Sequence, residues 1–130
     1  MDFVFPDSPV SELDDGVWTN YQNIKVKIAY ATNTKFMRTK QRLEQPFRRK
    51  IESGQMDPAD QKKILCQSMG EAILVDWDGV KNKAKEDVPY SKKAATQALM
   101  FDEAFRDFVM SYSMELGNFK TEEEEHEGNS

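Results

Sequence analysis

The segment DWDG at 76–79 is the strongest candidate for chemistry, because it places two carboxylates two residues apart and beside a glycine. Such a pair can bind a divalent cation, or can act as general acid and base. An EF-hand calcium loop with this glycine at its sixth position would begin at Leu74 and end at Lys85, and neither residue is acidic. A metal site that adds Glu86 to the two aspartates stays open as an alternative. The favoured interpretation is structural: the apolar residues end a helix, and Asp-Gly turns the chain.

No other pattern in the sequence indicates catalysis. Cys66 and His126 are the only cysteine and the only histidine, which argues against a structural zinc site, a Cys–His nucleophile and an internal disulfide. The sequence has no glycine-rich phosphate loop, no Ser-His-Asp arrangement and no HExxH motif. We therefore expect a binding protein and not an enzyme, with no cofactor and no metal.

Charged residues form separate blocks, although the net charge is only -5. Residues 1–15 hold five acids and no base, residues 25–50 hold nine bases and one acid, and residues 122–127 read EEEEHE. The bases in the middle block recur at helical spacing, which allows three interpretations: a solvated helix face, a surface for an acidic protein, or a phosphate-binding face. Nucleic acid is the least favoured partner, because the sequence pI is about 5.0 and no aromatic residues are interleaved with these bases on the exposed side.

Hydrophobic periodicity predicts a β-hairpin followed by four helices. Residues 16–21 and 24–31 are the expected strands, with a turn at Gln22-Asn23. The helices are expected at 34–53, 58–77, 92–100 and 101–116, with a break and restart at Phe101-Asp102. Thr32-Asn33-Thr34 offers an N-cap for the first helix, and Asp57 and Ser91 are the expected N-caps of the next two. Pro46 should divide the first of these helices, because proline removes a backbone donor.

We expect one domain that is mainly α with a small N-terminal β-hairpin (α+β), in which about four helices form a compact bundle. A flexible acidic N-terminus is predicted at 1–11, the helical domain with its hairpin at 12–120, and a disordered acidic tail at 121–130. No apolar run approaches the length of a membrane span, and the N-terminus lacks a signal-peptide pattern. No association with a membrane is expected.

The order of several segments over roughly residues 12–125 resembles the tail assembly chaperones of long-tailed bacteriophages. These segments are a short strand leading to Asn33, Lys35 and Phe36, a basic helix with a proline, LVDWDGV at 74–80, VPYS at 88–91, and Asn118-Phe119 before the acidic end. The resemblance implies a protein that binds the tape measure protein, keeps it soluble and helps recruit the major tail tube protein. It also implies action in the host cell cytoplasm and absence from the mature virion.

Partner binding is expected on two helices that combine basic and apolar side chains. The candidate residues are Arg38, Arg42, Arg49, Phe47, Phe105, Phe108 and Tyr112. The arginines would set orientation and association rate, while exposed parts of the rings would supply apolar contact. Charge blocks of opposite sign also predict self-association. The alternative function is a phage-encoded inhibitor of a host defence system, in which the acidic ends mimic nucleic acid.

Overall fold

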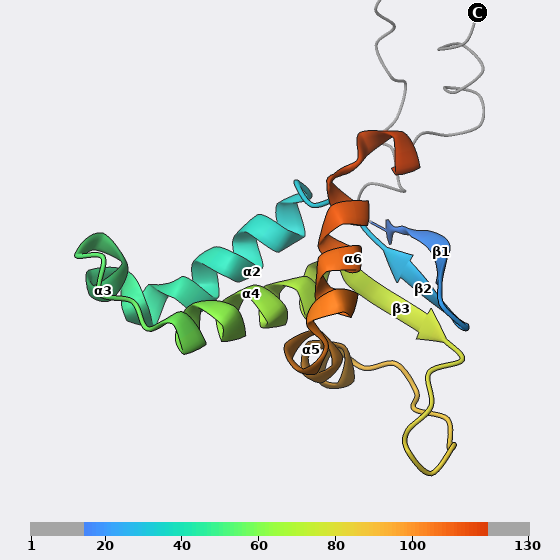
Figure 1. Ribbon diagram of the computed structural model, residues 1–130. Helices are drawn as coiled ribbons and strands as arrows, with labels where there is room; N and C mark the ends of the chain where they lie inside the picture. Colours follow the sequence, from blue (N-terminus) through green and yellow to red (C-terminus); the bar gives the residue numbers. More distant parts are fainter. Residues whose placement is uncertain (1–14, 120–130) are drawn as a thin grey trace, which may run out of the picture.

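The computed structural model describes residues 15–119, which form a three-stranded antiparallel sheet with helices packed on one face (Figure 1). In chain order the elements are β1 (Val17–Tyr21), β2 (Ile24–Ile28), α2 (Thr34–Glu44), the 3-10 turn η1 (Gln45–Phe47), α3 (Arg48–Glu52), α4 (Pro58–Ala72), β3 (Leu74–Asp78), α5 (Lys92–Phe101), α6 (Glu103–Met114) and the 3-10 turn η2 (Leu116–Phe119). The predicted α+β class is confirmed. The expected flexible N-terminus and disordered tail lie outside the described residues.

The predicted N-terminal hairpin is present. Tyr21 pairs with Ile24, so that only two residues make the turn, and Gln22 adopts a positive φ of 51° there. Val26 and Ile28 on β2 are fully buried on the inner face. An isolated hairpin is marginally stable in water, and burial of this face against the helices compensates for that.

The segment LVDWDGV is mainly a strand, and the prediction that it ends a helix is wrong. Helix α4 ends at Ala72, and β3 then pairs antiparallel with β2, placing Trp77 opposite Val26. A short run rich in Leu, Val and Trp fits a strand as well as a buried helix end, so periodicity alone cannot separate the two. The edge of β2 that does not face β1 favours the strand, because its backbone groups need hydrogen-bond partners.

The predicted helix boundaries after the hairpin are otherwise largely confirmed. Asp57 accepts a hydrogen bond from the Ala59 amide at 2.9 Å, and Ser91 accepts one from the Ala94 amide at 3.0 Å. Pro46 lies in η1, which separates α2 from α3 as its missing donor predicts. The last helix ends slightly earlier than expected, at Met114.

The core lies between the inner face of the sheet and helices α4, α5 and α6. Met69, Leu74, Leu99 and Val109 are fully buried there. Helices α4 and α5 approach each other closely at Gly70, where a Cβ atom would lie 2.5 Å from the Thr96 hydroxyl oxygen. Glycine at this position therefore sets the distance between the two helices.

Asn33 connects three elements through its buried side chain. Its Oδ1 accepts a hydrogen bond from the Phe36 amide at 2.7 Å and caps α2. Its Nδ2 donates to the carbonyl of Tyr30 at 2.6 Å and to that of Ala72, the last residue of α4, at 3.1 Å. A single side chain thus fixes the start of α2 against both the hairpin and the end of α4.

Replacing Asn33 with alanine should lower the free energy of unfolding by about 2–3 kcal/mol, because a helix cap is lost and the Ala72 carbonyl loses a donor in a buried place. Asn33→Ser retains a capping oxygen but lacks the amide donor. Its free energy of unfolding should therefore lie between those of the wild type and Asn33→Ala. Exposed Thr32→Ala is the matched control. Equal stability of Asn33→Ala and this control in urea denaturation would contradict the role given to Asn33.

Candidate protein-binding site

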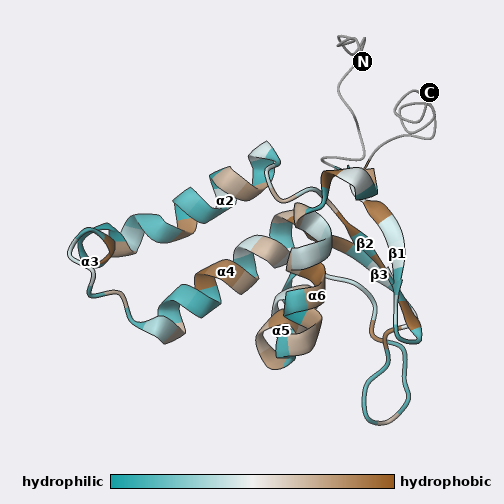
Figure 2. Ribbon diagram, turned by 45° about the horizontal axis from the view of Figure 1, so that its top comes forward, coloured by the Kyte–Doolittle hydropathy of each residue, from teal (hydrophilic) through white to brown (hydrophobic). Residues whose placement is uncertain are grey.

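Helices α2, α3 and the first half of α4 extend away from the sheet as an arm, with α2 and α4 side by side and α3 at the far end (Figures 1 and 2). We define the arm as residues 40–63. Not one side chain in this range is buried, whereas Thr39 and Ile64 on either side of it are. Ordering backbone costs about 1–2 kcal/mol per residue, and burial within the arm offsets little of this cost. Such a segment gains stability when a partner covers it.

An apolar hollow lies between the two long helices of the arm. It has a volume of about 290 Å³ and is lined by Lys40, Glu44, Ile51, Met56, Gln61, Ile64 and Leu65. Ile51 remains 40% exposed. The hollow therefore presents aliphatic and thioether side chains between polar edges, which suits an apolar side chain of another protein.

A larger, basic groove runs along α2 towards α3. It has a volume of about 700 Å³ and is lined by Arg38, Gln41, Arg42, Glu44, Gln45, Arg48, Ile51 and Glu52. The structure brings Arg38 and Arg42 together as the helical spacing predicted. Arg49 does not line the groove, and Arg48 takes that place. The 3-10 turn at Pro46 changes the number of residues per turn. The spacing of the arginines on α2 therefore could not show which of Arg48 and Arg49 faces the groove.

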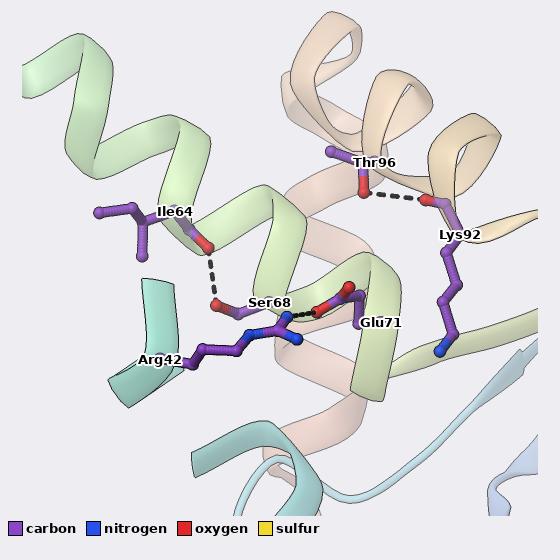
Figure 3. A network of polar contacts seen from close by, with 6 residues as sticks. All are labelled: Arg42, Ile64, Ser68, Glu71, Lys92 and Thr96. Carbon is purple, nitrogen blue, oxygen red and sulfur yellow. Dashed lines mark hydrogen bonds and ion pairs between the residues drawn. The ribbon is translucent and has the colours of Figure 1, made fainter. Parts of the chain in front are cut away.

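One ion pair joins the arm to the body of the domain. The Arg42 guanidinium donates to a carboxylate oxygen of Glu71 at 2.7 Å, as Figure 3 shows. The Arg42 side chain is 64% exposed, so this pair stabilises the fold by at most about 1 kcal/mol. Arg38 and Arg48 form no ion pair within residues 15–119. Their guanidinium groups can therefore pair with an anionic partner.

The remaining predicted contact residues lie elsewhere. Phe47 is half-buried on the arm. Phe105 and Phe108 of α6 pack on Tyr21 of the hairpin, with ring centroids 5.2 and 4.8 Å apart. Tyr112 packs against Phe108 in the same cluster. Phe105 is only 5% exposed, so these aromatic rings attach α6 to the sheet.

The two aspartates of the DWDG segment lie on the uncovered face of the sheet. Residues two apart on a strand share a face, and the register places Asp76 opposite Lys27 and Asp78 opposite Lys25. Opposite charges at such positions stabilise antiparallel pairs. Within the described part of the chain, no three His, Cys, Asp or Glu residues are grouped so that they could hold a metal ion.

Trp77 points the other way and anchors the loop that follows β3. Its indole nitrogen donates to the Val88 carbonyl at 2.8 Å, and its ring meets that of Tyr90 edge-on, with centroids 5.5 Å apart. The Tyr90 hydroxyl donates a hydrogen bond to the Leu74 carbonyl at 2.8 Å. Burial, assisted by the charge of Asp76, raises the pKa of Tyr90 to about 12.

The lone cysteine is a packing residue. Cys66 is fully buried, and burial raises the pKa of its thiol against a smaller opposing effect of Arg106. A buried thiol that stays protonated is a poor nucleophile. The interpretation of this residue as core is confirmed.

Comparison with known proteins identifies the chain as phage-derived. A family described as YdaY prophage protein matches residues 31–129. The chain therefore belongs to the YdaY prophage protein family. The match covers the arm and every later element, and it begins after the hairpin. The chain matches no curated protein and no solved structure. The phage origin implied by the resemblance is confirmed, while the family's description names no tail assembly role.

No helix within residues 15–119 has the length and hydrophobicity that crossing a membrane requires.

Exchange of Asp76 or Asp78 for asparagine should change the free energy of unfolding by less than about 0.5 kcal/mol each, because Asp78 is exposed and the half-buried Asp76 lies outside the core. Adding millimolar Mg²⁺ or Ca²⁺ should leave the melting temperature unchanged. A rise of several degrees with metal that disappears in the asparagine variants would restore the metal-site interpretation.

Tyr90 should make stability fall at high pH. The unfolded state loses this proton near pH 10 and the folded state only near pH 12, so deprotonation in that range favours unfolding. The stability advantage of the wild type over Tyr90→Phe should therefore be constant below pH 10 and shrink between pH 10 and 12. Urea denaturation of both proteins across this range measures the difference, and a constant difference would contradict the assignment.

Proposed function

We propose that this YdaY-family protein is a tail assembly chaperone that binds the tape measure protein through its arm. The observation that carries the proposal is the arm, an ordered helical segment without a buried side chain. Together with Arg38, Ile64 and Leu65 at its base, it lines an apolar hollow beside a basic groove. The resemblance to tail assembly chaperones and the prophage family support the phage context. No catalytic step is part of the proposal.

The two surfaces of the arm suit an amphipathic helix of the partner. Apolar side chains of that helix would enter the hollow around Ile51 and Met56, while acidic side chains on its flank would meet Arg38 and Arg48. Covering apolar helical surface is the physical means by which a chaperone prevents aggregation. The guanidinium groups would accelerate encounter more than they strengthen the final complex.

A contact confined to the hollow and the groove would suit a partner that must later be exchanged. Interfaces that bury less than about 1,200 Å² in total are usually transient. A chaperone that recruits tail tube subunits has to release its client when those subunits arrive. Self-association remains a further proposal, because oppositely charged blocks on separate copies can pair.

The test is co-expression with the tape measure protein encoded by the same prophage, measured as the fraction of that protein that stays soluble and co-purifies. The wild type should retain most of it. Ile51→Asp should lose this effect, because it places a carboxylate in the hollow and a residue that is 40% exposed tolerates the change without unfolding.

Met114→Asp is the matched control, since Met114 is 64% exposed at the end of α6 and outside the arm. It should behave as the wild type, and melting temperatures should confirm that both variants are folded. An insoluble tape measure protein beside the wild-type chain would contradict the chaperone function. Equal rescue by Ile51→Asp would contradict the use of the arm.

A further inference from the structure

Helices α2 and α3, which line the groove, carry an excess of positive charge. Residues 34–52 contain seven bases and two acids, Glu44 and Glu52. Arg38 and Arg42 lie four residues apart on one helix face, where like charges repel each other by a few tenths of a kcal/mol. Arg42 alone among the groove's bases has an ion-pair partner within residues 15–119. An anionic ligand at this place would relieve the repulsion.

The end of the described chain lies beside the start of α2. Phe119 is 1% exposed, and its ring centroid lies 5.4 Å from that of Tyr30, which precedes the α2 cap by three residues. The Ala31 amide also donates to the Ser113 carbonyl at 2.9 Å, which ties the α2 entry to the end of α6. Whatever follows Phe119 therefore starts at the base of the arm.

The next residues carry the complementary charge. Glu122, Glu123, Glu124 and Glu125 follow Phe119 by three to six positions. An extended chain spans at most about 3.3–3.6 Å per residue, so these carboxylates can reach about 10–20 Å from Phe119. Helical rise of about 1.5 Å per residue places Arg38 and Arg42 about 6 and 12 Å along α2 from Thr34. Because Phe119 packs on Tyr30 close to the start of α2, this reach is of the same size as the distance along α2 to the two arginines.

We infer that the acidic segment of residues 122–127 binds the basic groove of the arm in the same chain. A short tether holds a segment at roughly millimolar effective concentration, which favours this contact over the same contact between two copies in dilute solution. Glu44 and Glu52 on the groove wall oppose the segment and keep the contact weak. The segment would therefore act as a displaceable cover that an acidic partner has to replace.

The test places a nitroxide spin label at residue 129 (Asn129→Cys) of the full chain and records amide signals of the ¹⁵N-labelled protein. Cys66 is fully buried and will not take the label. We expect strong broadening of the amides of Lys35–Arg42 at low salt. The matched control carries the same label together with Glu122→Gln, Glu123→Gln, Glu124→Gln and Glu125→Gln, and it should lose this broadening. Salt at about 1 M, where the screening length is about 3 Å, should also remove it.

A mixture of labelled ¹⁴N protein with unlabelled ¹⁵N protein separates contact within a chain from contact between copies. No broadening of the Lys35–Arg42 amides in this mixture is the expected result. Broadening of equal strength in the mixture would overturn the inference in favour of pairing between copies. Broadening that is absent from α2, or that persists in the glutamine control, would also overturn it. The sample contains no tape measure protein, so the inference can fail or hold independently of the chaperone function.

Discussion

The side chain of Asn33 is the interaction on which the arrangement of the molecule depends. It caps α2 and at the same time binds the last carbonyl of α4, so the two long helices leave the body of the domain from one fixed point. The hydrogen bond to Tyr30 ties this point to the hairpin. Because these partners come from three segments, the direction of the arm is determined by the core and not by the arm itself.

Burial divides the chain into a body and an arm. Side chains are buried through Thr39 on α2 and again from Ile64 on α4, and the range between them has none. The body stabilises itself by packing α4, α5 and α6 on the sheet. The arm is held by its helix caps, by the modest Arg42–Glu71 pair and by partial contact between α2 and α4. This division explains why the surface suited to a partner lies away from the core.

Local features of the fold could be predicted because local chemistry determines them. The two-residue turn at Gln22-Asn23, the caps at Asp57 and Ser91, and the break at Pro46 follow from residue types at single positions. The strand at 74–78 could not be predicted this way, since it exists only because β2 offers backbone partners. A helical end and a strand share the same short apolar pattern.

The candidate site shows the same limit. The shared position of Arg38 and Arg42 on one side of α2 follows from helical spacing within one element. The hollow could not be predicted, because Ile51 and Met56 meet Ile64 only after the chain reverses between α3 and α4. The sequence predicts Phe105 and Phe108 of α6 as contact residues, but Tyr21 of a distant strand packs against both rings.

The most direct test of the account is hydrogen exchange of this protein with and without the tape measure protein. The arm should exchange rapidly when the chain is alone, because its amides lie in helices without buried side chains. Binding should slow exchange in residues 40–63 and leave the strands unchanged. Protection that appears instead around the exposed Phe101 at the α5–α6 corner, with none in the arm, would contradict the claim that the arm binds the partner.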